Sequence, residues 1–215
     1  MVYSLLFSPT AYGQLRNSDP EISLTQQLLL IRHATTDLAG KLCGHLDPPL
    51  NLDGGAQAAA LAHLLRAVPV DRVYASDLRR AVQTAVPLAH MRGISVLERR
   101  DLREISFGAW EGMRWHDLYP RNNLPLAAFE SSNVFPPDGE SFHDFHHRVL
   151  HALNEIILPS PYRTTAVVTH LGVIRIALIA LAQINPASDL LRRIEYCSVH
   201  RFLVSEGTWK FDGRL

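Results

Sequence analysis

The sequence predicts an α/β domain in which helices cover both faces of a mostly parallel sheet. From residue 27 onward, apolar runs of strand length alternate with segments whose apolar residues recur at helical spacing, which is typical of this class. The chain has 215 residues, 47% of them apolar, and this is enough to bury one core. We therefore expect one domain over residues 27–215, preceded by a loose N-terminal extension over residues 1–26.

The first half of this alternation predicts two strands and two helices. Leu28–Ile31 is an unbroken apolar run, as in a strand that is buried on both faces. Asp53–Ala67 has helical periodicity, and Asp53 is expected to be its N-cap. Val70–Ala75 predicts the second strand, and Ser76 is placed to cap a second helix. The inward side of that helix is expected to consist of Leu78, Ala81, Val82, Ala85 and Ala89.

The second half continues the same pattern. Apolar residues at helical spacing predict a long amphipathic helix over about Glu140–Ile157. Thr165–Thr169 predicts a strand, and Gly172–Gln183 is apolar nearly all round, which indicates a buried helix. The chain is then expected to end in a hairpin, whose strands and turn are Val199–Val204, Thr208–Phe211 and Glu206–Gly207.

Composition and charge exclude several classes of function. Lys and Arg together number 21, as do Asp and Glu, and charged residues make up 20% of the chain. This balance disfavours a largely disordered chain, a collagenous chain and a generally basic nucleic-acid-binding protein. The expected partner is therefore a small molecule.

The sequence also bears on the compartment. The apolar run Val2–Phe7 is short and has no basic residue before it, so it does not resemble a secretory signal. Val173–Ala182 is interrupted by Arg175 and is far below the roughly 20 residues of a membrane span. The two cysteines, Cys43 and Cys197, fit a reducing compartment. We predict a cytoplasmic protein with no nucleic-acid or membrane partner.

Two of the predicted buried strands end in a histidine. Arg32 and His33 follow the first strand directly, and His170 follows Thr169 at the end of the later one. In open α/β sheets, ligands bind beyond the carboxyl ends of the strands. Both imidazoles are therefore expected at the edge where sites form.

Two arginines, Arg79 and Arg80, fall in the first turn of the predicted helix after Ser76. Cations at this position oppose the helix macrodipole by about 0.3–1 kcal/mol each, unless an anion is bound there. With Arg32 nearby, such a pocket would suit a dianion, and phosphate is the commonest one.

A histidine in a phosphate pocket can perform covalent chemistry. Neutral imidazole attacks phosphorus and forms a phosphoramidate that water can later hydrolyse. This scheme needs an acid for the leaving oxygen and then a base for the water. Glu104 is a candidate, although position alone does not separate it from Glu98, Asp101 or Glu111.

Five spaced segments carry a more specific signal. They are Leu30–Thr36, Ser76–Ala85, Leu102–Gly112, Asp138–Ser141 and Val168–Arg175. In this order they resemble the motifs of the histidine phosphatase superfamily, in its phosphoglycerate mutase-like branch. Five motifs in order are far more specific than any one of them.

The resemblance implies a three-layer α/β/α fold of the phosphoglycerate mutase-like type, with no metal and no other cofactor. By position in the motifs, His33 matches the phosphorylated nucleophile and Glu104 matches the proton donor. The residues that match the phosphate clamp are Arg32, Arg79 and His170.

The loop Gly44–Asn51 resembles the family's loop beside the pocket. We accordingly expect Thr36, Gly44 and His45 to bind phosphate or substrate. Residues 113–136 are expected to form a cap over the pocket and to carry substrate specificity, and the C-terminal hairpin could pair across a homodimer.

The sequence departs from the family pattern at a few positions. Ala34 and Thr35 replace a glycine and an acidic or amide residue, Ala39 replaces an asparagine, and Leu171 stands where a second glycine is common. Loss of the asparagine would remove one hydrogen bond to phosphate, worth about 1.5–3 kcal/mol if charge-assisted. The departures bear on substrate identity and efficiency.

The short stretch between Glu104 and Pro137 resembles the phosphatase side of the family, including its alpha-ribazole phosphatase-like and broad-specificity members. The hypothesis is a phosphomonoesterase that acts on a small-molecule phosphomonoester through phosphohistidine at His33. Phosphoryl transfer of the cofactor-dependent phosphoglycerate mutase type is an alternative. A zinc hydrolase using His33, His170 and Glu104 is another. The last alternative is a catalytically weak phosphate-binding module, which the departures from the family pattern suggest.

Overall fold

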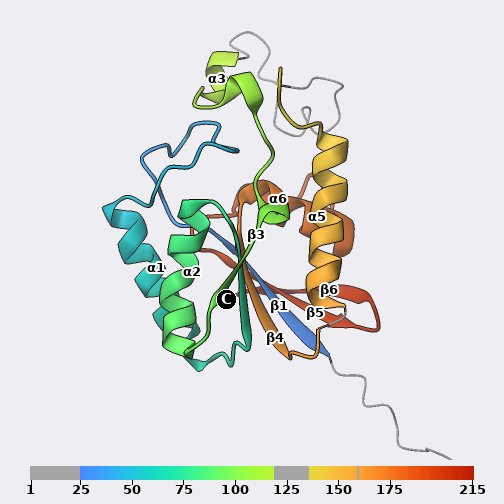
Figure 1. The fold of residues 1–215 in the computed structure, drawn as a ribbon. Coiled ribbons are helices and arrows are strands. Elements are labelled where there is room, and N and C mark those ends of the chain that lie inside the picture. Colours follow the sequence, from blue (N-terminus) through green and yellow to red (C-terminus); the bar gives the residue numbers. More distant parts are fainter. Residues whose placement is uncertain (1–24, 119–135, 159) are drawn as a thin grey trace, which may run out of the picture.

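A computed structural model of the chain describes residues 25–118, 136–158 and 160–215. The predicted N-terminal extension up to residue 24, and residues 119–135 of the predicted cap, lie outside the described residues. The strands are β1 (Gln26–Arg32), β2 (Arg72–Ser76), β3 (Val96–Arg99), β4 (Thr164–Thr169), β5 (Val199–Ser205) and β6 (Thr208–Arg214). They form one sheet in the order β3-β2-β4-β1-β5-β6 (Figure 1).

The sheet has a parallel part and an antiparallel part. β3, β2, β4 and β1 are parallel neighbours, whereas β5 pairs antiparallel with both β1 and β6. Parallel neighbours need a long crossover, while a hairpin needs only a tight turn. The turn is Glu206–Gly207, with φ angles of 50° and 74°, and two positive φ angles match the twist of a hairpin. The predicted mostly parallel sheet and C-terminal hairpin are confirmed.

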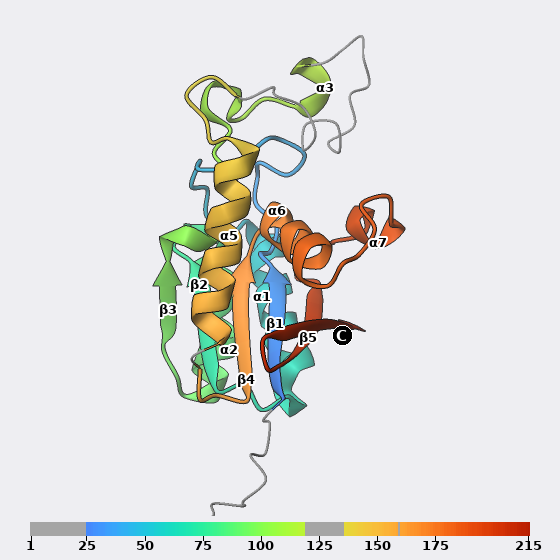
Figure 2. The ribbon, with the colours of Figure 1, turned by 90° about the vertical axis from the view of Figure 1, so that its right-hand side faces the viewer.

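Helices cover both faces of the sheet. α1 (Leu52–Leu64) and α2 (Arg79–Arg92) lie against one face, and α5 (Phe142–Ile157) and α6 (Leu171–Ile176) lie against the other (Figures 1 and 2). This is the predicted three-layer α/β/α arrangement.

Two apolar clusters join these layers, and β1 contributes to both. Because successive side chains of a strand point to opposite faces, Leu28 and Leu30 pack with α5 and α6, whereas Leu29 and Ile31 pack with α1 and α2. All four side chains are fully buried. β1 is therefore the centre of the core, and its carboxyl end is held on both sides.

Two predicted helix starts are wrong. α1 is capped by Asn51, whose Oδ1 accepts the N–H of Gly54 at 2.8 Å, and not by Asp53. α2 starts at Arg79 with Leu78 at its N-cap position, because Ser76 is still the last residue of β2. Asp77 and Leu78 therefore separate the strand from the helix.

The helix predicted over Gly172–Gln183 divides into α6 and a π-helical turn over Ala177–Leu181. β3 and α7 (Asp189–Arg192) were not predicted, because each is only four residues long. The remaining short helices are Leu65–Ala67, Arg100–Leu102, Gly108–Trp110 and α3 (Trp115–Leu118). Within the part of the chain that the structure describes, no helix combines the length and apolar character needed to cross a bilayer.

Candidate active site

The carboxyl ends of β1 and β4 bring the two predicted histidines together. In the parallel register Arg32 lies beside Thr169, so His33 and His170 are the next residues on neighbouring strands. The backbone N–H of His33 donates to the Thr169 carbonyl at 2.9 Å, and the two ring centroids are 5.1 Å apart. Segments that are far apart in sequence therefore meet as expected.

The ring of His33 is fixed by one hydrogen bond. Its Nδ1 lies 2.7 Å from the Ala34 carbonyl oxygen, which can only accept, so Nδ1 carries the hydrogen and Nε2 keeps its lone pair. Burial lowers the pKa of His33 to about 3, and the charge of Arg80 adds to this effect. The imidazole is therefore neutral near pH 7, which is the form that attacks phosphorus.

His170 is fully buried, and neither of its ring nitrogens has a hydrogen-bond partner among the described residues. Burial lowers its pKa well below the ordinary value, followed by the charges of Arg80 and His33. Buried polar atoms are rarely left without partners, so such atoms require an explanation. A ligand that accepts or donates hydrogen bonds at this point would supply it.

Two arginines, Arg32 and Arg80, interact electrostatically with both histidines. Arg32 donates through Nη1 to the Ile194 carbonyl at 2.7 Å, and its guanidinium carbon lies 3.8 Å from the centre of the Tyr196 ring. Arg80 is fully buried. The Nε atoms of both arginines are buried without a partner among the described residues. The pKa of Arg32 is lowered by its burial.

The structure does not bring Arg79 to this cluster, in contrast to the prediction. Its side chain is exposed on α2, on the same helix face as the exposed residues Gln83, Val86 and His90. Arg80 is one position further around the helix and shares a face with the buried residues Thr84 and Leu88. Each arginine has a polar residue four positions on, Gln83 or Thr84, so helical spacing alone does not separate them.

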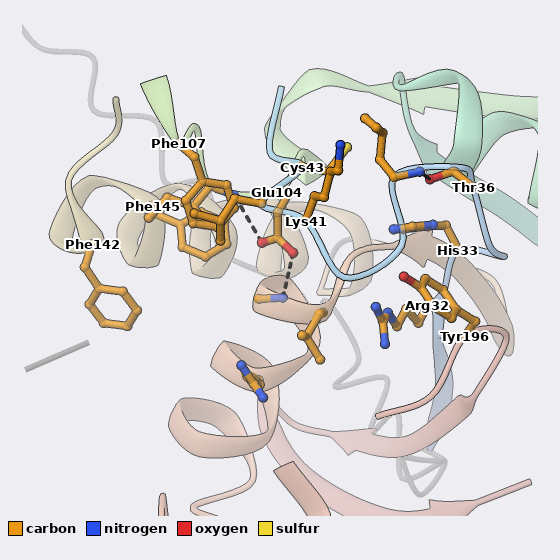
Figure 3. A pocket seen from close by; sticks show the side chains of 16 residues that line it. Arg32, His33, Thr36, Lys41, Cys43, Glu104, Phe107, Phe142, Phe145 and Tyr196 are labelled. Atoms are coloured by element: carbon orange, nitrogen blue, oxygen red, sulfur yellow. Dashed lines mark hydrogen bonds between the residues drawn. The ribbon is translucent and has the colours of Figure 1, made fainter. Parts of the chain in front are cut away.

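Glu104 lies in the segment between β3 and α3, and it lines the same pocket as His33. Its Oε1 accepts the Ile105 N–H at 3.1 Å and its Oε2 accepts the Gly172 N–H at 3.0 Å, as the dashed lines in Figure 3 show. A Cβ atom at Gly172 would overlap Oε1 of Glu104, so the glycine is required for this approach. Glu104 is buried, with 9% of its surface exposed.

The loop of residues 43–47 is held from two sides. Arg80 donates to the carbonyls of Leu46 at 2.6 Å, Gly44 at 2.8 Å and Cys43 at 3.0 Å. Glu111 accepts the N–H groups of Gly44 at 2.9 Å and His45 at 2.7 Å from the other side. Sequence reasoning did not single out Glu111, because nothing in its local pattern distinguishes it from a solvated glutamate.

The structure places the three residues expected to bind phosphate or substrate in different surroundings. These residues are Thr36, Gly44 and His45. Thr36 is buried and lines the pocket. The N–H of Gly44 donates to Glu111 and its carbonyl accepts from Arg80, so both backbone polar groups of Gly44 already have partners within the protein. The ring of His45 lines a second, charged cavity with Arg103, Glu140 and Arg148 among others. The structure therefore does not place His45 in the phosphate pocket.

A cavity of about 170 Å³ opens beside His33 and Glu104 (Figure 3). Its lining has three cations and one carboxylate, together with a mainly apolar wall. Figure 3 shows Arg32, His33 and Tyr196 at one side of it and Phe107, Phe142 and Phe145 at the other. The lining residues that carry charge are Arg32, Lys41, Glu104 and Arg175.

The zinc alternative requires His33, His170 and Glu104 on one ion. Among residues 25–118, 136–158 and 160–215, no group of three His, Cys, Asp or Glu side chains is close enough to hold a metal. Fixed cations beside the histidines are also unfavourable next to a divalent metal but favourable next to phosphate. The geometry therefore gives that alternative no support.

Comparison with known proteins places this geometry in context. Residues 28–214 match the family model of the "Histidine phosphatase superfamily (branch 1)". The chain is 33% identical over 187 residues to the adenosylcobalamin/alpha-ribazole phosphatase of Salmonella typhimurium, covering 85% of this chain and 88% of that protein. It is 34% identical over 194 residues to a metal-independent phosphoserine phosphatase of Arabidopsis thaliana, covering 86% and 79%.

A solved structure is similar as well. Mycobacterial glucosyl-3-phosphoglycerate phosphatase in complex with inorganic phosphate superimposes with a TM-score of 0.72 and 26% identity, over 87% of this chain and 96% of that one. The family-model match over residues 28–214 includes the strand ends that carry His33 and His170.

Proposed function

The chain belongs to the histidine phosphatase superfamily, and on that premise we propose that it hydrolyses a small-molecule phosphomonoester through a phosphohistidine intermediate on His33. Glu104 is the proton donor in this proposal, and Arg32, Arg80 and His170 hold the phosphoryl group. Arg80 takes the role that the motif comparison gave to Arg79, because Arg80 is the arginine beside the histidines.

One observation carries the proposal. Arg32, Arg80 and His170 each bury ring or guanidinium nitrogens that have no hydrogen-bond partner among the described residues. All three act electrostatically with His33, whose ring is neutral with Nε2 available. Donors left unpaired around a neutral nucleophile are suited to an anion that carries several acceptor oxygens.

The first step transfers the phosphoryl group to the protein. The Nε2 lone pair of His33 forms a bond to phosphorus while the bond from phosphorus to the ester oxygen breaks. Glu104, in its protonated form, gives its proton to the leaving oxygen, so the alcohol departs neutral. The guanidinium groups balance the negative charge on the phosphoryl oxygens throughout.

The second step returns the enzyme to its starting state. The Glu104 carboxylate removes a proton from a water molecule, whose oxygen attacks phosphorus while the phosphorus–nitrogen bond breaks. Inorganic phosphate leaves, His33 is again neutral, and Glu104 is again protonated. Water rather than a second phosphorylated molecule is the proposed acceptor, since the relatives reported above are named as phosphatases.

Trapping of the intermediate tests the proposal. We expect rapid acid-free denaturation during turnover of 4-nitrophenyl phosphate to yield a phosphorylated chain, with an acid-labile, alkali-stable group that maps to His33. His33→Gln should give neither the adduct nor turnover, and a chelator should leave the wild-type rate unchanged. Full activity of His33→Gln, or a phosphate group on another residue, would refute the proposal.

A further inference from the structure

Arg148 lies outside the catalytic pocket, yet it contacts the backbone that carries Glu104. Its Nη1 donates to the carbonyls of Asp101 at 2.8 Å and Arg103 at 3.0 Å, and its Nη2 donates to the carbonyl of Glu104 itself at 3.4 Å. Arg148 comes from the middle of α5, so it connects this long helix to the segment that follows β3.

The other donors of Arg148 are also in use. Its Nε and Nη2 bind the two carboxylate oxygens of Glu140 at 2.8 and 2.7 Å. A guanidinium has five N–H donors in one plane, and here all five have an acceptor. The guanidinium carbon also lies 5.1 Å from the centre of the Phe145 ring. Each of these contacts restricts the position of the guanidinium group.

The segment 101–104 depends on such contacts because it belongs to no strand. Its fourth carbonyl, that of Leu102, accepts the hydroxyl of Thr169 at 2.8 Å. All four carbonyls from Asp101 to Glu104 are thus bound by side chains from two elements of the core, α5 and β4. Thr169 directly precedes His170, so the same contacts set the distance from the acid to the phosphate pocket.

We propose that Arg148 is a positioning residue for the proton donor, and that it acts by fixing the backbone of residues 101–104 so that Glu104 points at the leaving oxygen. This inference rests on the proposed function, because it requires Glu104 to be the acid. Lysine at this position would keep the charge, but its single nitrogen cannot span three carbonyls and a carboxylate. Glu104 would then lose its fixed direction while the phosphate pocket stays intact.

Ring-substituted phenyl phosphates test this proposal, because they vary the basicity of the leaving oxygen at nearly constant shape. 4-Nitrophenolate leaves without a proton, whereas phenolate and 4-methoxyphenolate need one. A displaced acid therefore slows the poor leaving groups selectively. The value to measure is kcat/KM for each ester, because it reports the step that breaks the ester bond.

For Arg148→Lys we expect kcat/KM to fall about 30-fold on 4-methoxyphenyl phosphate and less than about threefold on 4-nitrophenyl phosphate. Glu104→Gln should show the same selectivity with a larger ratio. The double variant should show no more selectivity than Glu104→Gln, because Arg148 acts through Glu104. The ratio of two esters in one sample does not depend on how much of the protein is folded.

Arg99→Lys is the matched control. Arg99 also ties this region to α5, through Asp101 and Glu155, but it donates to side chains and to no backbone carbonyl of the segment. It should leave the ratio unchanged. Equal losses of Arg148→Lys on all esters would overturn the positioning role while Glu104→Gln remains selective. A Glu104→Gln variant without selectivity would instead overturn the proposed role of Glu104.

Discussion

The two histidines and the glutamate of this site are held in different ways. His33 and His170 follow neighbouring parallel strands, and the backbone hydrogen bonds of β1 and β4 set their positions. Glu104 and the loop 43–47 lie outside the sheet, and side chains of other elements, mostly charged ones, hold their backbone. Substitution of a strand-held residue should therefore remove its reactive group without moving its neighbours. Substitution of a side chain that holds Glu104 or the loop should displace groups that take part in catalysis or binding.

Loss of the nucleophile should give the largest effect with little change of fold. His33→Ala removes a side chain from a position that the strand maintains, so we expect kcat to fall by about 10⁴-fold or more while the protein stays folded. Steady-state kinetics and thermal unfolding measure the two quantities. A variant that loses its structure together with its activity would contradict the division between the two regions.

The neighbouring arginines of α2 sharpen the comparison. Arg80→Gln removes three hydrogen bonds to the loop and a buried charge beside His33, and we expect kcat/KM to fall by about 10²–10³-fold. Arg79→Gln changes an exposed side chain, and its effect should stay within about threefold. The two variants differ by one position on the same helix. The reverse order of effects would restore Arg79 as the phosphate ligand.

A methyl group added beside Glu104 should lower activity by displacing the Glu104 carboxyl group without removing it. Gly172→Ala would place its Cβ against Oε1 of Glu104 and within 3.0 Å of the Phe145 ring, so we expect kcat/KM to fall by about 100-fold. Gly55→Ala is the control, because a Cβ there meets nothing within 4 Å. Equal activity of the two variants would show that Glu104 tolerates displacement.

The carboxylate behind the loop should give a smaller effect on substrate binding. In Glu111→Gln one oxygen becomes an NH₂ group that cannot accept the loop N–H groups, so at least one stays unpaired. We expect KM to rise about tenfold and the free energy of unfolding to fall by about 1–3 kcal/mol. Substrate titration and urea unfolding measure these changes, with exposed Glu98→Gln as the control. An unchanged KM would mean that the loop does not contribute to binding.

The last prediction concerns the pH dependence of stability and not the rate of turnover. The pKa of His33 is about 3 in the folded protein and about 6.5 in an unfolded chain. Between these values the unfolded chain binds more protons, so the free energy of unfolding must fall as the pH is lowered from 6.5 toward 3. His33→Gln should remove its share of this slope. Urea unfolding at several pH values compares the slopes, and identical slopes would contradict the burial of a neutral His33.

Much of the sheet-held region was predictable from the sequence, and the physical reason is its periodicity. The apolar run at Leu28–Ile31 fixes β1, and the residue after a buried strand must lie at its carboxyl edge. The same reasoning places His170 after β4. Both positions follow from local patterns and one topological rule.

The region held by side chains was less accessible to such reasoning. Glu111 contacts the loop 43–47, and Arg148 contacts residues 101–104. These contacts join residues that are 40 or more positions apart, and no periodic pattern in the sequence predicts them. Arg79 was chosen by its position within the motif Ser76–Ala85, whereas the burial of Arg80 on α2 is visible only in the structure. The cytoplasmic location, the homodimer and the cap remain predictions.

A crystal structure of the protein soaked with vanadate tests the central claim most directly. We expect vanadate to be bonded to Nε2 of His33, with donors from Arg32, Arg80 and His170 on its oxygens and the Glu104 carboxyl group facing the apical position of the leaving group. Vanadate bound away from His33, or held by Arg79 in place of Arg80, would contradict it.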